Sequence, residues 1–178
     1  MSKILTTQLS GLLQRIAQSE ESSIEETARL LAQAGVGQGN VYFACFGELQ
    51  AIEVNALLAT ERFLKLLPWT KDVPLTSADR VCIFTRSCKD EQALALAKYL
   101  SDAFIPFSAV SSEANDQENE LANLSFTYIS LKVRGGIMPN DIGERIVVPH
   151  TLAALFVYEA VKVAYDEMLA IDDDEELE

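Results

Sequence analysis

The feature that most constrains the fold is a series of short apolar runs separated by segments with helical patterning. The four runs are residues 41–46, 81–85, 107–110 and 126–131. A short apolar run without alternating polar residues predicts a strand that is covered on both faces of a sheet. Residues 48–67 and 90–104 lie between the first three runs and carry apolar residues at helical spacing. Strands that alternate with helices predict parallel βαβ units with right-handed crossovers.

Further helices are expected towards both ends of the chain. Leucine and isoleucine residues at helical spacing predict a first helix over residues 3–18. A second helix is expected to begin with a capping box at Ser22 or Ser23 and to end at Gly35. Residues 151–171 predict a long closing helix. We therefore expect an α/β fold: a three-layer, doubly wound, Rossmann-like parallel sheet with N-terminal helices and a long C-terminal helix.

Length and charge indicate one acidic domain. The 178 residues are 49% hydrophobic, which is enough to form a buried core. We expect a single domain over residues 1–171 and an acidic tail at residues 172–178. The net charge is −13, and the six acidic residues of the tail contribute almost half of it. A strongly acidic surface repels phosphate backbones and anionic lipid, so we expect neither a nucleic-acid nor a membrane partner.

Several other classes of protein are disfavoured by the composition. No segment approaches the roughly 20 consecutive apolar residues that cross a membrane, and the first residues lack the pattern of a signal peptide. The spacing of Cys45, Cys82 and Cys88 fits neither a disulfide framework nor a zinc site. The single histidine excludes a multi-histidine metal centre. We expect a cytoplasmic protein that needs no metal and no cofactor.

The turn after the second strand is the first candidate for a binding site. Ligands of open parallel sheets bind beyond the carboxyl ends of the strands, where the strand order reverses. The turn at residues 85–90 offers two hydroxyls and two cations: Thr85, Ser87, Arg86 and Lys89. With free N–H groups at a helix N-terminus, these side chains suit a phosphate. The alternative is a capping box, with Ser87 as the N-cap and Asp90 three residues later.

Two ionisable residues are candidates for acid–base chemistry. Glu53 is the only charged residue between Leu49 and Thr60, and burial in this apolar segment would raise its pKa towards the range of a general base. The alternative is a salt bridge or polar contact at a helix or subunit interface. His150, the only histidine, stands where the last helix begins, which favours a neutral imidazole. Alternatively, it packs in the core or caps the helix.

Two further features have a functional and a structural interpretation. Cys88 lies at the start of a helix, where the helix dipole and Lys89 could favour a thiolate. No cysteine has an arginine six positions later, which disfavours a cysteine phosphatase. Residues 134–145 form a segment rich in glycine and basic residues that could cover a site or simply connect two elements.

The order of these elements resembles the sugar isomerase (SIS) domain over residues 3–170. The turn at residues 85–90 is similar to the Ser-x-Ser-Gly-x-Thr phosphosugar loop of that family, and residues 89–111 resemble the helix and strand that follow it. The resemblance implies a protein that binds a small sugar phosphate. The implied phosphate-binding residues are Gly47, Thr85, Arg86, Ser87, Cys88 and Lys89.

Within the SIS family, the chain is most similar to the phosphoheptose (sedoheptulose 7-phosphate) isomerases. These enzymes use a glutamate in the helix after the first strand and a histidine near the last helix, where this chain has Glu53 and His150. The resemblance implies that these two residues move a proton between C2 and C1 of an open-chain sugar phosphate through an enediol. We also expect a homo-oligomer, a dimer or tetramer, because the apolar segments 48–67 and 151–170 offer more hydrophobic surface than one sheet face needs. The resemblance implies sites between the subunits.

Departures from the family pattern keep other hypotheses open. Of the first-turn motif Gly-x-Gly-x-Ser, only Gly47 is present, and Leu49 replaces the hydroxyl. In the second turn, Cys88 replaces a glycine and Asp90 a threonine. The alternative to an isomerase is a non-catalytic regulatory or scaffold SIS module that has lost the sugar-phosphate site. A third hypothesis is a flavodoxin-like nucleotide or flavin binder.

Overall fold

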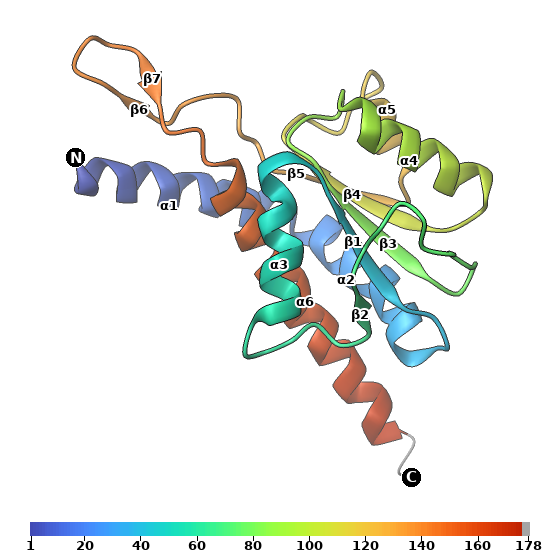
Figure 1. The fold of residues 1–178 in the computed structure, drawn as a ribbon. Helices are drawn as coiled ribbons and strands as arrows, with labels where there is room; N and C mark the ends of the chain where they lie inside the picture. Colours follow the sequence, from blue (N-terminus) through green and yellow to red (C-terminus); the bar gives the residue numbers. More distant parts are fainter. Residues whose placement is uncertain (176–178) are drawn as a thin grey trace.

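The computed structural model describes residues 1–175, and its centre is a five-stranded parallel sheet with the strand order β2-β1-β3-β4-β5 (Figure 1). The strands are β1 (Val41–Cys45), β2 (Leu66–Leu67), β3 (Arg80–Phe84), β4 (Phe107–Ser111) and β5 (Thr127–Ser130). β1 and β3 pair over their whole length, with Val41 opposite Arg80 and Cys45 opposite Phe84. The prediction of a doubly wound parallel sheet is confirmed, and all four apolar runs form strands of it.

Helices cover both faces of the sheet, which gives three layers (Figure 1). They are α1 (Ser2–Ser19), α2 (Glu21–Val36), α3 (Gln50–Leu58), α4 (Glu91–Asp102), α5 (Glu120–Leu124) and α6 (His150–Glu175), with a short 3-10 helix η1 (Gly47–Leu49). Alternate residues of β1 point to opposite sides: Phe43 packs with the α1, α2, α3 and α6 side, and Tyr42 with the α4 and α5 side. Because both faces are covered, every residue of β1 is buried.

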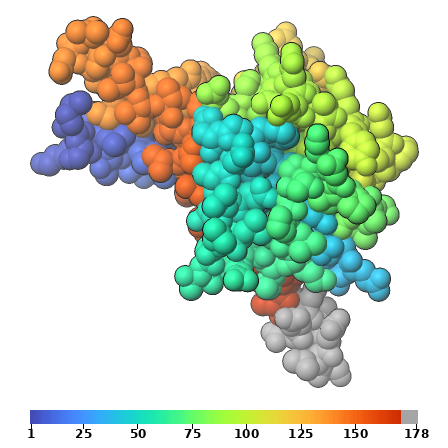
Figure 2. Space-filling view, in the orientation of Figure 1, coloured from blue at the N-terminus to red at the C-terminus, as the bar shows by residue number. Residues whose placement is uncertain are grey.

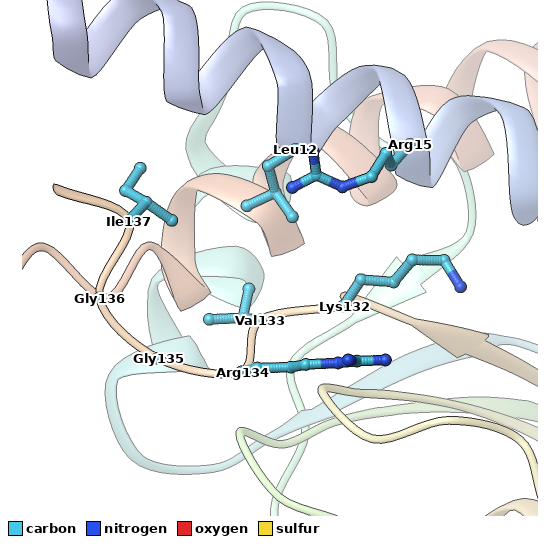
Figure 3. A pocket seen from close by; sticks show the side chains of 8 residues that line it. All are labelled: Leu12, Arg15, Lys132, Val133, Arg134, Gly135, Gly136 and Ile137. Atoms are coloured by element: carbon cyan, nitrogen blue, oxygen red, sulfur yellow. The ribbon is translucent and has the colours of Figure 1, made fainter. Parts of the chain in front are cut away.

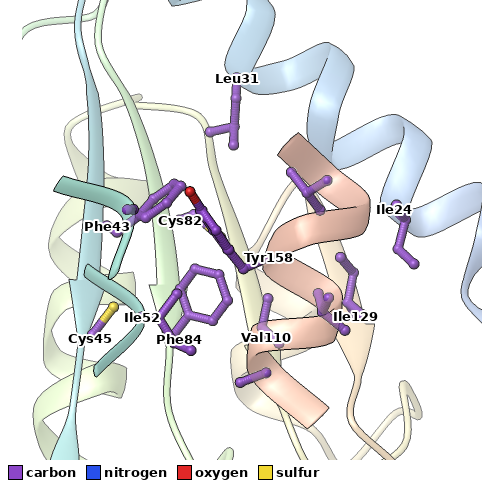
Figure 4. Close-up of a cluster of buried hydrophobic side chains, with 14 of the residues drawn as sticks. Ile24, Leu31, Phe43, Cys45, Ile52, Cys82, Phe84, Val110, Ile129 and Tyr158 are labelled. Atoms are coloured by element: carbon purple, nitrogen blue, oxygen red, sulfur yellow. The ribbon is translucent and has the colours of Figure 1, made fainter. Parts of the chain in front are cut away.

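The larger core lies between the sheet and α6 and is built around aromatic rings (Figure 4). The ring of Phe43 lies 5.0 Å from Phe63, 5.5 Å from Phe84 and 6.0 Å from Tyr158, in edge-to-face arrangements. Phe63 also stacks on Tyr165 at 4.2 Å. Such pairs each add about 0.5–1.5 kcal/mol beyond the burial of their surface. They join α6 to β1 and β3, the two strands that carry the turns of interest.

The single helix expected at residues 48–67 is wrong in its second half. The helical part comprises η1 and α3 and ends at Leu58, and β2 then adds an edge strand beside β1. Between them the chain leaves the helix so that Phe63, which is only 3% exposed, can enter the core. Lys65 adopts a positive φ of 62° just before β2. The apolar pattern of this segment reflects burial of a loop and an edge strand, which periodicity does not separate from burial of a helix.

The expected capping box at Ser22 or Ser23 is also wrong. Only Glu20 separates α1 from α2, and its backbone N–H donates to the carbonyl of Ile16 at 2.9 Å. The Glu20 side chain is buried instead: its carboxylate accepts from the Ser130 N–H at 3.1 Å and pairs with Lys132 at 2.8 Å. This contact ties the α1–α2 junction to the end of β5.

The segment at residues 134–145, expected to connect or to cover, contributes to a small hairpin. Its strands β6 (Met138–Pro139) and β7 (Arg145–Ile146) pair antiparallel and lie beside α1, away from the main sheet (Figures 1 and 2). No helix among residues 1–175 is long and apolar enough to cross a membrane. Of the predicted acidic tail, residues 172–175 belong to α6, and residues 176–178 lie outside the described residues.

Candidate functional site

The strand order fixes where a site can form. The order reverses between β1 and β3, since β2 lies on one side of β1 and β3, β4 and β5 lie on the other. The carboxyl ends of β1 and β3 are therefore the point at which ligands of such sheets bind. The turn after β1 begins with Gly47, which has a φ of 61°, and the turn after β3 begins at Thr85. The backbone N–H of Phe46 donates to the carbonyl of Phe84 at 2.9 Å, which holds the two turns together.

A small charged cluster connects these turns to the start of α6. An oxygen of Glu48 lies 3.7 Å from the guanidinium of Arg86 and 3.8 Å from Nδ1 of His150. Three elements distant in sequence thus meet at the point where the strand order reverses: η1, the turn after β3 and the first residue of α6. The sequence predicted Arg86 and His150 as site residues. Glu48 was not among the predicted site residues, because nothing local in the sequence places it beside Arg86 and His150.

His150 is held largely in its neutral form. Its side chain is 13% exposed, and burial lowers the pKa of the imidazole below its usual value. The carboxylate of Glu48 raises that pKa, while the guanidinium of Arg86 lowers it. A neutral imidazole can both accept and donate a proton near neutral pH, which is the state needed for general acid–base chemistry.

Glu53 lies in α3 and has a structural contact. The half-buried carboxylate accepts a hydrogen bond from the backbone N–H of Trp69 at 2.6 Å and so holds the segment that follows β2. This is the polar-contact alternative that the sequence left open. Within residues 1–175, no hydrogen bond or ion pair joins Glu53 to His150. A catalytic pair of these residues therefore stays a prediction.

The turn at residues 85–90 is capped differently from the expected capping box. Asp90, not Ser87, is the N-cap of α4, and its carboxylate accepts from the Ala93 N–H at 2.9 Å. Thr85 is buried and donates to the carbonyl of Ser87 at 3.3 Å. The oxygen of the Ser87 hydroxyl accepts from the Lys89 N–H at 3.2 Å. Because Asp90 caps the helix, the Ser87 hydroxyl proton and the Cys88 N–H can be donated to another group.

That other group is Glu113, which the sequence reasoning missed. The Ser87 hydroxyl donates to one carboxylate oxygen at 2.7 Å. The Cys88 N–H at 2.8 Å and the Ser111 hydroxyl at 3.2 Å donate to the other. Burial alone would raise the pKa of the Glu113 carboxyl, but the hydrogen bonds from Cys88, Ser87 and Ser111 together hold it below its usual value. The available signal was an acidic residue just beyond the next parallel strand, β4.

Cys88 is not the activated thiolate that its helix-start position suggested. It is only 7% exposed, and burial raises the pKa of the thiol, as does the neighbouring charge of Glu113. The positive charge of Lys89 lowers the pKa of the thiol, but not enough to cancel this rise. Cys88 therefore contributes its backbone N–H to the turn, and its side chain remains a protonated thiol.

Two hollows adjoin the carboxyl end of β5. One, of about 500 Å³, is lined by Ser112, Glu113, Ala114, Asp116, Ser130, Lys132, Val133 and Arg134. The other, of about 390 Å³, lies between α1 and the segment after β5 and brings Arg15 near Lys132 and Arg134 (Figure 3). Lys132 and Arg134 border both hollows. Basic side chains are thus gathered beside Glu113, although the chain as a whole is strongly acidic.

The chain belongs to the DUF2529 family, a domain of unknown function whose profile matches residues 1–169. It is 31% identical over 170 residues to the uncharacterized protein YwjG of Bacillus subtilis, and the match covers 95% of this chain and 98% of that protein.

Solved structures show that the fold is that of the SIS domain. A Bacteroides fragilis protein described as a candidate phosphosugar isomerase involved in capsule formation has a TM-score of 0.72 and 13% identity, covering 92% of this chain and 87% of its own. The E. coli CFT073 protein c3406, solved as a complex with a ligand, has a TM-score of 0.64 and 18% identity, covering 93% and 88%. The sugar isomerase domain of the RpiR transcription factor from Sphaerobacter thermophilus has a TM-score of 0.58 and 12% identity, covering 98% and 97%.

Proposed function

We propose that this DUF2529 protein binds a sugar phosphate in the cytoplasm, at the carboxyl ends of β1 and β3. The observation that carries the proposal is the cluster of Glu48, Arg86 and His150, which joins both turns and the start of α6 at the point where the strand order reverses. A likeness of fold does not fix a function, but two of the similar proteins have names that connect the fold with sugars or sugar phosphates.

The proposed phosphate position is the turn after β3. The exposed cations Arg86 and Lys89 offset the charge of the anion. The Ser87 hydroxyl and the Cys88 N–H, which bind Glu113 in this structure, would supply hydrogen bonds to it once Glu113 is displaced. Thr85 is buried and holds the turn through its bond to the Ser87 carbonyl. A Cβ added at Gly47 would meet no atom within 4 Å. The turn after β1 therefore leaves open space beside Gly47.

The proposed reaction is an aldose–ketose isomerisation of a sugar phosphate such as sedoheptulose 7-phosphate. A base removes the proton from C1 of the ketose, and the enediol that forms accepts a proton at C2, while the second group moves the hydroxyl proton between the two oxygens. His150 and Glu53 are the proposed pair. The neutral state of His150 supports its role, since a neutral imidazole can take up a proton and release it again.

The proposed catalytic unit is a homo-oligomer, a dimer or a tetramer. Glu53 contacts Trp69 within its own chain, so its meeting with His150 is proposed to occur between copies. Two exposed apolar residues of α3, the helix that carries Glu53, support a subunit contact there: Val54 is 55% exposed and Leu58 is 77% exposed. Sedimentation at micromolar concentration should give a dimer or tetramer, and a monomer would contradict the shared site.

The second candidate function is a non-catalytic regulatory or scaffold SIS module. The observation that favours it is the Glu113 carboxylate, which already accepts hydrogen bonds from Ser87 and Cys88. In such a module Glu113 would take the place of the phosphate, and the turn would no longer bind a sugar phosphate. The RpiR transcription factor gives an example of this fold in a protein with a regulatory name.

An activity assay and a binding assay together separate the two functions. Purified protein is incubated with sedoheptulose 7-phosphate and related ketose phosphates, and the aldose formed is measured. The isomerase hypothesis predicts turnover that Glu53→Gln and His150→Ala each abolish, with Glu61→Gln as a control outside the site. A stabilisation of about 2.7 kcal/mol is expected at a ligand concentration of 100 times the dissociation constant. Stabilisation without turnover would support sugar-phosphate binding and contradict the isomerase reaction. Neither effect would contradict the proposed binding and leave only the non-catalytic module.

A further inference from the structure

We infer that Glu113 is a built-in ligand of the turn at residues 85–90 and that it competes with every anion that binds there. The inference rests on the proposed function only in taking this turn as the phosphate position. Glu113 lies outside the residues that the family resemblance implicates, and it approaches the turn from the neighbouring strand, just after the end of β4. Its role is to compete with a ligand.

The carboxylate uses the donors that a phosphate would need. Its two oxygens accept from the Ser87 hydroxyl, the Cys88 N–H and the Ser111 hydroxyl, at 2.7, 2.8 and 3.2 Å. Hydrogen bonds to a charged acceptor are roughly twice as strong as those between neutral groups, so this contact is a stable one. A phosphate cannot share these donors with Glu113, because the two anions would occupy one place and repel each other.

Buried groups hold Glu113 in position. The hydroxyl of Tyr128, a side chain only 3% exposed, donates to the backbone carbonyl of Glu113 at 2.8 Å, and the oxygen of the Ser111 hydroxyl lies 2.6 Å from it. Burial raises the pKa of Tyr128 to about 12, so this donor keeps its proton. Asn119, 2% exposed, donates to the carbonyl of Ala114 at 2.9 Å. The backbone on both sides of the Glu113 side chain is therefore fixed by the core.

The structure also provides a place to which the carboxylate can move. Glu113 lies on the wall of the hollow of about 500 Å³, which is lined as well by Lys132 and Arg134. In this proposal the Glu113 side chain turns into the hollow. Arg134 is the main cation there to compensate its charge, because Lys132 already pairs with Glu20 at 2.8 Å. A phosphate arriving at the turn would then replace the carboxylate on Ser87 and Cys88, while the displaced charge is compensated in the hollow.

This competition lowers the affinity for every anion that needs the turn. The apparent dissociation constant is the intrinsic one divided by the fraction of molecules in which the turn is open. If the open fraction is about one tenth or less, removal of the carboxylate tightens binding by at least about tenfold. A ligand that does not use the turn gains nothing from that removal.

The test measures binding by isothermal titration calorimetry at pH 7.5 (about 3 units above the usual glutamate pKa). Inorganic phosphate and sedoheptulose 7-phosphate are titrated into the wild type, Glu113→Ala, Glu113→Gln and the control Glu118→Gln. Glu118 is exposed in the same loop, so the control removes one negative charge without touching the turn. Glu113→Gln keeps the shape of the side chain, and circular dichroism checks that both Glu113 variants fold. The amide resonance of Cys88 reports whether the ligand reaches the turn.

The inference predicts that Glu113→Ala binds inorganic phosphate at least about tenfold more tightly than the wild type, that Glu113→Gln lies between them, and that Glu118→Gln equals the wild type. Equal binding by the wild type and both Glu113 variants, with a shift of the Cys88 amide, would overturn the inference and leave the proposed function intact. Tighter binding of phosphate but no binding of the sugar phosphate would support the inference and contradict the proposed function. No binding by any variant would overturn both.

Discussion

The charge of Glu48 should control the protonation of His150. The distance between the Glu48 oxygen and Nδ1 of His150 is 3.8 Å, and the Glu48 side chain is 45% exposed, so the attraction is screened by water. With the dielectric constant of water, Coulomb's law gives about 1 kcal/mol in favour of the imidazolium at this distance. Glu48→Gln removes this attraction and should lower the pKa of His150 further below its usual value. Arg86→Gln removes a repulsion and should raise that pKa.

The chain contains one histidine, so a proton NMR titration follows His150 without assignment. The midpoints of the wild type, Glu48→Gln and Arg86→Gln are compared at low salt. Glu167→Gln is the control, since it lies on α6 about 25 Å further along the helix. The reasoning fails if Glu48→Gln leaves the midpoint unchanged or raises it, or if the two site variants shift it in the same direction.

Two further predictions concern the supports of the site. Glu20→Ala should lower the free energy of unfolding by about 2 kcal/mol, because it leaves the Ser130 N–H without its acceptor and breaks the ion pair with Lys132. Urea unfolding measures this loss, and exposed Glu21→Ala should change stability little. Gly39→Ala should destabilise by at least about 2 kcal/mol, because a Cβ there would lie 1.9 Å from the Ala78 carbonyl oxygen. Thermal unfolding tests this, with Gly135→Ala, whose Cβ would meet open space, as the control; equal stability of the two variants would contradict it.

The sequence predicted the structure correctly where a residue pattern is typical of only one kind of element. The apolar runs 41–46 and 81–85 predicted β1 and β3, because a strand covered on both faces needs apolar residues throughout. The segment 48–67 was misread because burial of Phe63 in a loop gives the same apolar pattern as burial in a helix. The β6–β7 hairpin was missed because its two short strands pair mainly with each other and leave little periodicity.

In the candidate site too, features that are local in the sequence were predicted, and contacts that depend on tertiary structure were missed. The turn at residues 85–90 was predicted because its hydroxyls and cations are neighbours in the sequence. Its place beside Glu48 and His150 results from the strand order. Glu113 was missed because its bond to Ser87 spans 26 positions and depends on the register of β3 against β4. A carboxylate near the end of a neighbouring parallel strand reaches an adjacent turn only through tertiary structure.

A sugar phosphate should bind at the carboxyl ends of β1 and β3. The most direct measurement is a titration of isotope-labelled protein with sedoheptulose 7-phosphate, followed by NMR. Binding at these turns should give saturable shifts of the amides of Ser87, Cys88 and Lys89 and of the His150 ring. Shifts confined to the hollow beside Arg15 and Arg134, or no shifts at millimolar ligand, would contradict it.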